Sequence, residues 1–169
     1  MKALEAIYSR RSIRVFTGDE VPQEDVEKML RAAMTAPSAC NQQPWHFVVV
    51  RDKETHRRIM GVQKYTAMLE KASVAIIVCA QPGLEKCPGF WVQDVSAAAE
   101  NILLAAHALG YGATWCGLYP RDDPVWGVRE IIGAPKDVVP FCVIAVGVPG
   151  EEKPPSQRYK RERVHFERW

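Results

Sequence analysis

The sequence is short, nearly neutral and without the motifs that mark most enzyme classes. Its 169 residues contain no G-x-x-x-x-G-K-[ST] segment to hold nucleotide phosphates and no G-x-S-x-G turn to present a nucleophilic serine. No C-x-x-C pair or Cys/His cluster has the spacing of a metal site, and the four histidines stand apart from motif partners. Kinase, hydrolase and zinc chemistry therefore have no support in this sequence.

The chain also has neither a large charge excess nor a long apolar run. Lys and Arg number 22 against 20 Asp and Glu, and a net charge of +2 argues against a general nucleic-acid or membrane-surface binder. The run Val74–Ala80 is too short to cross a bilayer, and Val92–Leu109 contains Asp94 and Glu100. The N-terminus shows no signal-peptide pattern. We expect neither nucleic acid nor membrane as a partner.

The five cysteines are odd in number and scattered along the chain. Cys79 and Cys142 lie in apolar runs, where cysteine usually behaves as a small buried hydrophobic residue. This pattern favours a cytoplasmic protein whose thiols are reduced.

The length predicts a single domain, and the hydrophobic periodicity predicts its elements. Helices are expected at Lys2–Ser9, Pro22–Met34, Lys53–Met60, Trp91–Leu109 and Val125–Ile132, and strands at Trp45–Arg51, Val74–Ala80, Ala113–Leu118 and Phe141–Val148. Pro and Gly residues predict a loop over Gln81–Gly89, and residues 151–169 are polar and extended. Helices and strands alternate loosely, which indicates layers of both around one sheet.

The longest expected helix is apolar or small on nearly every side. Ala97, Ala98 and Ala105 add small faces to an apolar stripe, so the helix should be buried on several sides. Packing against a second subunit would do this in so short a chain. A central helix of a monomer would do it equally well, and composition alone does not choose between them.

Two clusters of basic residues lie near the two ends of the chain. Ser9–Arg14 holds three arginines and two serines, a composition that can bind an anion such as phosphate. The alternative is that Arg10 and Arg11 only complement the C-terminus of the preceding helix. Arg158–Arg161 could form a second arm of a phosphate clamp or a solvated charge run.

Two further segments could contact a flat heterocycle. Asn41, Gln42 and Gln43 carry paired donors and acceptors, although a polar turn explains them as well. Gly110–Pro120 superficially suggests a dinucleotide-binding turn. That interpretation fails because Trp115 stands at the third glycine position, and because the segment follows a helix and leads into a strand.

Together, these segments resemble the FMN-dependent nitroreductase family over nearly the whole chain. The resemblance is carried by Arg10–Arg14, by Pro37–Trp45, by Gly112–Gly117 and by the ending Val164–Trp169. It implies an α+β fold of three α/β/α layers with a mostly antiparallel central sheet. It also implies a homodimer of single 1–169 domains, with 151–169 an extended arm and FMN at the subunit interface in two sites per dimer.

The resemblance implies roles for individual residues. Phosphate, ribityl chain and flavin edge would be held by Arg10, Arg11, Ser12 and Arg14, with Arg158 and Lys160 joining at the phosphate. The partner subunit would contribute Pro37, Ser38, Asn41 and Gln43, and the other flavin face would meet Trp115, Cys116, Gly117 and Leu118 through backbone. Phe90 and Trp91 would lie on the substrate side, and Lys64 is nearest to a flavin-contacting position before the Val74 strand.

The implied reaction is NAD(P)H oxidation through FMN. The flavin would take a hydride at N5 from NADH or NADPH and pass electrons to a nitroaromatic, a quinone or a similar flat electrophile in ping-pong order. No catalytic acid or base is required of the protein, in keeping with the absence of a dyad. The alternatives are another FMN chemistry on the same scaffold, such as dehalogenation or flavin fragmentation, and a non-catalytic flavin-binding dimer.

Overall fold

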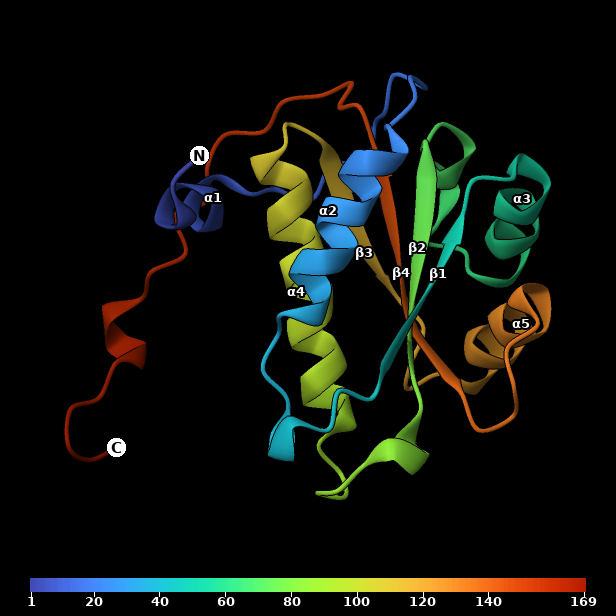
Figure 1. The fold of residues 1–169 in the computed structure, drawn as a ribbon. Helices are drawn as coiled ribbons and strands as arrows, with labels where there is room; N and C mark the ends of the chain where they lie inside the picture. The colour runs from blue at the N-terminus through green and yellow to red at the C-terminus, as the bar shows by residue number, and fades with distance from the viewer.

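A computed structural model describes all residues 1–169, and its elements follow the predicted order (Figure 1). The helices are α1 (Ala3–Ser9), α2 (Gln23–Met34), α3 (Lys53–Val62), α4 (Trp91–Ala108) and α5 (Asp122–Ile132). The strands are β1 (Trp45–Val50), β2 (Val74–Ala80), β3 (Gly112–Gly117) and β4 (Val139–Gly147). Short 3₁₀ turns lie at Ala39–Asn41, Ala67–Glu70, Pro82–Leu84 and Arg161–Arg163. None of the helices has the length and hydropathy needed to cross a membrane.

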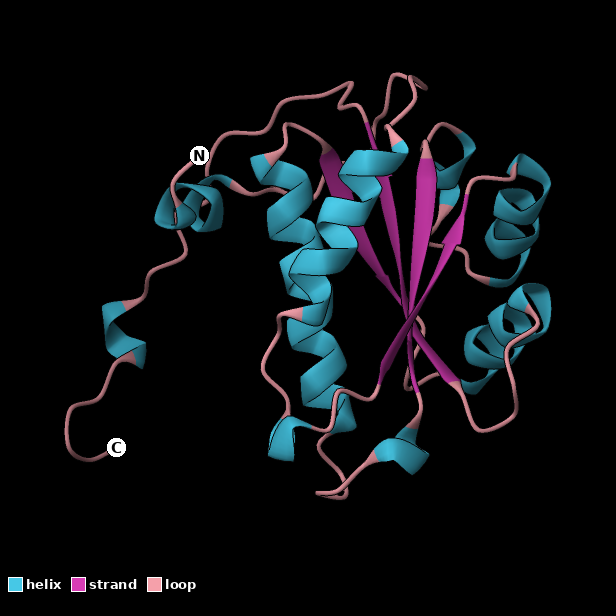
Figure 2. Cartoon of the chain, in the orientation of Figure 1, coloured by secondary structure: helices cyan, strands magenta, loops and turns pink.

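The four strands form one antiparallel sheet in the order β1-β2-β4-β3 (Figure 2). Helices α2 and α4 cover one face, and α3 and α5 cover the other (Figure 1). The expected α+β fold of three layers is therefore confirmed. The antiparallel sheet also confirms that the glycine-bearing Gly110–Pro120 segment is not a dinucleotide-binding turn, which needs a parallel βαβ unit.

The two central strands are buried on both faces, which explains their unbroken apolar sequences. Alternate side chains of a strand point to opposite faces. Accordingly, Ile76 and Val78 pack beneath α2 and α4, whereas Ala75 and Ile77 pack beneath α3 and α5. Because neither face of β2 or β4 is free, ligands can reach the sheet only along its edges and beyond its ends.

Most element boundaries agree with the sequence predictions to within two residues. Helix α5 starts three residues earlier than expected, because Asp122 and Asp123 occupy its first turn, where acidic side chains suit the helix dipole. Gly133 ends this helix in the left-handed conformation, as a C-terminal glycine commonly does. The expectation of reduced thiols throughout is wrong in this structure, since Cys40 and Cys87 form a disulfide. Cys79 and Cys142 are buried as predicted.

The segment that follows α1 packs against two glycines, and this contact positions the arginine cluster. The backbone of Ser12 pairs with Ala113 of β3. A Cβ atom at Gly112 would stand 2.7 Å from Cγ2 of Ile13, and one at Gly147 would stand 2.9 Å from the Phe16 ring. Such distances exclude any larger residue unless the segment moves. Glycine at these two positions makes room for the Ile13 and Phe16 side chains.

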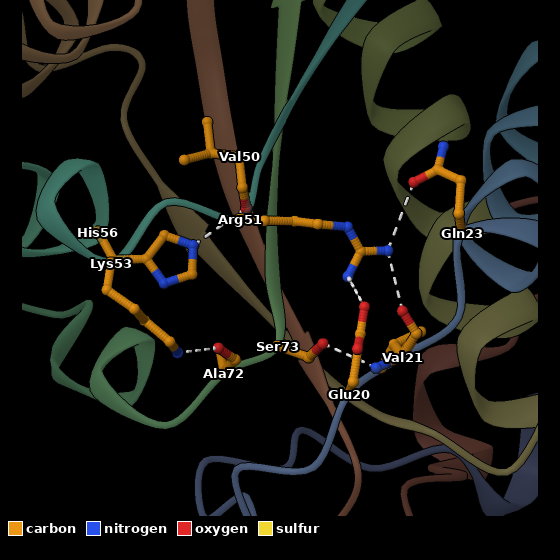
Figure 3. Close-up of polar contacts among 9 residues, drawn as sticks. All are labelled: Glu20, Val21, Gln23, Val50, Arg51, Lys53, His56, Ala72 and Ser73. Atoms are coloured by element: carbon orange, nitrogen blue, oxygen red, sulfur yellow. Dashed lines mark hydrogen bonds and ion pairs between the residues drawn. The ribbon is translucent and has the colours of Figure 1, made fainter.

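A group of polar contacts joins α2, β1, α3 and β2 at one end of the sheet (Figure 3). Arg51 donates to the Val21 carbonyl at 2.9 Å, and Val21 N–H donates to Ser73 Oγ at 2.7 Å. The fully buried His56 ring lies 3.0 Å from the carbonyl oxygens of both Val50 and Leu69. The ring thus lies between two backbone carbonyls to which it can donate, which indicates a structural role for this histidine.

We predict that His56→Leu lowers the free energy of unfolding by about 1–3 kcal/mol, because the carbonyls of Val50 and Leu69 lose the ring N–H donor that lies between them. Urea denaturation would measure the change. His46→Leu is the matched control, because His46 is exposed and bonds only Gln81, and it should stay within about 0.5 kcal/mol of the parent. Equal stability of the two variants would contradict a structural role for His56.

Candidate functional site

A cavity of about 520 Å³ lies beside β3, one of the two edge strands of the sheet. It is lined by Arg14, Lys64, Tyr65, Ala67, Met68, Trp115, Cys116, Gly117, Tyr119 and Arg121. Arg14 comes from the segment after α1, the next four residues precede β2, and the rest lie in β3 or follow it. The structure thus brings together Arg14, Lys64 and the Trp115–Gly117 segment, three parts of the chain that the sequence analysis selected separately.

The charge of this cavity is entirely positive. Arg14, Lys64 and Arg121 line it, no carboxylate does, and none of the three cations forms an ion pair. The centre of the Tyr65 ring lies 5.0 Å from Nζ of Lys64 and 5.8 Å from Cζ of Arg121. Aromatic side chains beside unpaired cations suit a planar ligand that carries negative charge.

A second cavity, of about 610 Å³, lies between α1 and the C-terminal arm. It is lined by Ile7, Tyr8, Arg10, Ser156, Gln157, Arg158 and Tyr159. Arg10 and Arg158 therefore face the same space although 148 positions separate them, as the phosphate-clamp hypothesis requires. Within the chain, Arg10 is paired with Glu100 of α4 at 3.3 Å and is largely shielded from solvent.

The segment between the two cavities is held in place by a carboxylate of the arm. Glu151 Oε1 accepts from the backbone N–H groups of Arg14, at 2.7 Å, and Val15, at 3.2 Å. The N–H of Arg14 and the nearby ammonium of Lys153 lower the pKa of Glu151. Lys153 also donates to the Ser12 carbonyl at 3.0 Å. The arginine segment is thus tied to β3 on one side and to the arm on the other.

Apart from the Pro37–Gln43 loop, the predicted cofactor residues that line neither cavity are Arg11, Ser12, Leu118 and Lys160. Arg11 donates to the Pro154 carbonyl, so its side chain fastens the arm and points into a different hollow. Leu118 is fully buried and its N–H donates to Phe141, which leaves little of it for a ligand. Lys160 is exposed at the start of the last 3₁₀ turn and lines neither cavity.

The Ser38–Gln43 loop forms its own rigid corner beyond the end of β1. The buried Asp94 of α4 accepts from Ala39 N–H at 2.9 Å and from the Gln42 amide at 2.6 Å. Gln42 is therefore used inside the chain. By contrast, Asn41 and Gln43 are exposed, bond each other at 2.7 Å and remain available to a ligand or a partner. None of this loop lines the two cavities of the same chain.

The predicted substrate-side residues begin α4. Glu85 Oε1 accepts from the N–H groups of both Phe90 and Trp91 at 2.9 Å, and so satisfies free donors at the helix start. The Trp91 ring meets Tyr119 edge to face at 4.8 Å, and Tyr119 lines the 520 Å³ cavity. Trp91 therefore does not line this cavity itself but packs against a residue that does. Phe90 is 45% exposed and lines neither cavity.

Several residues that shape the site were not found by sequence reasoning. They are Tyr65, Tyr119 and Arg121 in the cavity, Asp94 beneath the loop and Glu151 beside Arg14. Asp94 gave the one usable signal, since a carboxylate inside an apolar helix requires a polar partner. The others are ordinary surface residue types, and only the fold places them.

The chain belongs to the nitroreductase family, whose sequence profile matches residues 7–76 and 62–148. A protein of Methanothermobacter thermautotrophicus, provisionally named an NADH dehydrogenase/NAD(P)H nitroreductase, is 51% identical over 169 residues, which cover 100% of this chain and 88% of that protein.

Two solved structures extend the comparison. A protein of Bacteroides thetaiotaomicron with the same provisional name is 38% identical with a TM-score of 0.95, and the match covers 99% of this chain and 98% of that one. A nitroreductase from Desulfovibrio desulfuricans, solved in complex with FMN and also provisionally assigned, is 30% identical with a TM-score of 0.84. That match covers 100% of this chain and 98% of that one.

We predict that Asp94→Ala lowers the free energy of unfolding by about 1–3 kcal/mol, because the Gln42 amide and the Ala39 N–H lose their acceptor. Asp123→Ala is the matched control, since it removes an exposed carboxylate from the first turn of α5 and should cost at most about 1 kcal/mol. Thermal or urea unfolding would measure both. A smaller effect at Asp94 than at Asp123 would show that the loop does not depend on this carboxylate.

Proposed function

We propose that this chain is an FMN-dependent NAD(P)H oxidoreductase that reduces flat electrophilic acceptors such as nitroaromatics and quinones. The observation that carries the proposal is the acid-free cavity beside β3, where Arg14, Lys64 and Trp115–Gly117 meet. The FMN complex of the D. desulfuricans relative supports the choice of cofactor. The nitroreductase names of relatives that share the full length support the choice of reaction.

The residues present fit the two ends of FMN. The 520 Å³ cavity has aromatic walls and unpaired cations, which suit the ring system, and the Arg10–Arg158 cavity suits a doubly charged phosphate. The chain between Arg10 and Arg14 spans about 13 Å if extended at about 3.3 Å per residue. In an extended segment Arg10, Ser12 and Arg14 share one side, so a single elongated anion can meet all three.

When bound, FMN supplies the hydride chemistry, and the protein binds and orients it. Arg14 and Lys64 line the cavity as unpaired cations, and they would stabilise the negative charge that a flavin bound there gains on reduction. Glu151 holds the backbone of Arg14 in position. Tyr119 offers the cavity an aromatic side chain against which a flat acceptor can pack, and Trp91 supports it edge to face. No side chain has to supply a proton from a catalytic dyad.

The proposed assembly is a homodimer in which each chain completes the other's flavin site. In support, residues 151–169 contain no buried residue and extend away from the body of the chain (Figure 1). Tyr159, Phe166 and Trp169 on this arm are 77%, 71% and 102% exposed, which is unfavourable in water unless another surface covers them. The residues that would then reach the partner's flavin line neither cavity of their own chain: Pro37, Ser38, Asn41 and Gln43.

We predict that the purified protein is yellow and holds one FMN per chain, and that anaerobic NADH or NADPH bleaches its flavin absorption. Arg10→Ala and Arg14→Ala should each raise the FMN dissociation constant about 10- to 100-fold, as expected for a lost charge-assisted hydrogen bond. Their free energies of unfolding in the absence of FMN should change by less than about 1 kcal/mol. Flavin fluorescence titration gives the affinities.

Arg57→Ala provides the control, because Arg57 is an exposed arginine of α3 that pairs only with Glu54. It should bind FMN like the parent. A colourless protein that fails to bind added FMN would refute the cofactor proposal. Bound flavin that neither nicotinamide reduces would favour a non-catalytic flavin-binding dimer. Flavin that is reduced but passes no electrons to a nitroaromatic or a quinone would favour dehalogenation or flavin fragmentation.

We predict a particle of twice the 19.0 kDa chain mass in sedimentation equilibrium. The double variant Phe166→Asp/Trp169→Asp should raise the dimer dissociation constant at least tenfold, because two large apolar side chains leave the interface. Trp126→Asp is the control, since Trp126 is 60% exposed on α5, away from the arm, and should leave the dimer intact. A monomeric parent protein would exclude the shared site.

A further inference from the structure

One covalent bond in the structure has no role in the proposed reaction. Cys40 and Cys87 are joined as a disulfide across 47 positions, with Cα atoms 6.3 Å apart, within the ordinary range for such bonds. Cys40 is exposed and Cys87 is partly buried, whereas Cys79, Cys116 and Cys142 are all buried. Cys40 is therefore the only cysteine of this chain that is exposed on the protein surface.

The bond connects two loops that lie on either side of the α4 N-terminus. Cys40 lies in the Ser38–Gln43 loop, and Cys87 stands three residues before Phe90. The loops share a second connection through Gln42, whose amide oxygen accepts from the N–H groups of Lys86 and Cys87 at 2.9 Å and 3.0 Å. We call the disulfide, Gln42 and Asp94 together the clasp.

The backbone inside the clasp is strained and needs support. Cys40, Asn41 and Gln43 have φ angles of 51°, 51° and 48°, in the left-handed region that non-glycine residues rarely adopt. Such conformations persist only where the surroundings hold them. Of these three residues, only Cys40 is covalently attached to the rest of the protein through its side chain. Cutting that attachment leaves the loop held only by hydrogen bonds, chiefly those of Gln42 and of Asp94.

We propose that Cys40–Cys87 is a thiol–disulfide exchange site that a dithiol reductant opens, and that its opening loosens the Ser38–Gln43 loop. A thiolate of the reductant attacks the exposed Cys40 sulfur, forms a mixed disulfide and releases Cys87 as a thiolate, which takes a proton. The reductant's second thiol then closes its own disulfide and releases Cys40, which also becomes a thiol. Two electrons pass from the dithiol to the protein.

The consequence for catalysis rests on the proposed function. If Ser38, Asn41 and Gln43 of one subunit contact the flavin of the other, the oxidised clasp preorganises that contact and the reduced clasp weakens it. The redox state of the surroundings then sets how firmly the enzyme retains FMN. Gln42 and Asp94 remain paired in both states, so the loop relaxes without unfolding the domain.

The remaining cysteines do not interfere with a thiol count. Burial raises the pKa of Cys79 to about 12 and that of Cys116 to about 11, and it also raises the pKa of Cys142. Thiols that are buried and protonated react slowly with alkylating reagents. Rapid labelling of the native protein therefore reports on Cys40 and Cys87, and peptide mapping distinguishes them from Cys116, which lines the 520 Å³ cavity.

The first test counts thiols in the native holoenzyme with iodoacetamide and mass spectrometry. We expect no labelled cysteine before treatment with dithiothreitol, two after mild treatment, and peptide maps that place both labels at Cys40 and Cys87. Two rapidly labelled cysteines in air-equilibrated protein, or a disulfide that dithiothreitol leaves intact in the folded protein, would overturn the proposal.

The second test measures backbone hydrogen exchange in the oxidised and reduced protein. Peptides covering residues 38–43 should exchange at least fivefold faster after reduction, while peptides of β2 should not change. The double variant Cys40→Ser/Cys87→Ser should exchange fast in that loop with or without dithiothreitol, which controls for side effects of the reagent. Equal loop exchange in the oxidised and reduced parent protein would overturn the proposal even if the variant fails to fold.

A third measurement separates this inference from the proposed function. The FMN dissociation constant should rise at least threefold when the parent protein is reduced and should not respond to reductant in the double variant. Failure to bind FMN in any state would refute the cofactor proposal but leave the thiol count and the exchange data standing. Tight, redox-independent FMN binding together with a loosened loop would refute the link between the clasp and the flavin.

Discussion

Burial of the sheet on both faces is the constraint on which the rest of this structure depends. In this chain of 169 residues, α2 with α4 covers one face of the four-stranded sheet and α3 with α5 covers the other. The apolar strands β2 and β4 are therefore buried on both faces. The polar residues of the candidate site lie at the β3 edge, in the loops beyond the strands and on the arm. No helix or strand of the same chain buries residues of the arm, which is why a second subunit is proposed to cover it.

Electrostatic arrangement, rather than net charge, gives the proposed site its character. The whole chain is close to neutral, yet the cavity beside β3 is lined by three cations and no acid. The carboxylates near the arginine segment do not pair with the cations of this cavity. Glu151 accepts from the backbone N–H of Arg14, and Glu100 pairs with the Arg10 side chain. Acids that hold the scaffold thus leave Arg14, Lys64 and Arg121 unneutralised for a ligand. A small phosphate-bearing cofactor matches that arrangement better than a polyanion would.

The periodicity of the sequence predicted nearly all helices and strands because their apolar faces are strong local signals. Strand β2 is a continuous apolar run, and α4 ends before Gly110. The start of α5 was missed because no apolar pattern covers its acidic first turn. The site was predicted less completely. Motif resemblance found Arg10, Arg14, Trp115 and Gly117, whereas Tyr65 and Arg121 carry no local pattern and become neighbours only when η2 (Ala67–Glu70) and α5 fold onto the same sheet.

The sequence by itself determined the layered α+β fold, the order of elements and the family, since these depend on hydrophobic period and on short motifs read along the chain. Tertiary structure alone decided three matters. It divided the arginine cluster, turning Arg11 to the arm while Arg10 and Arg14 face separate cavities. It used Gln42 inside the clasp and left Asn41 and Gln43 exposed. It also paired Cys40 with Cys87, because the bond depends on two loops 47 positions apart meeting at one helix end, a proximity that no local sequence pattern encodes.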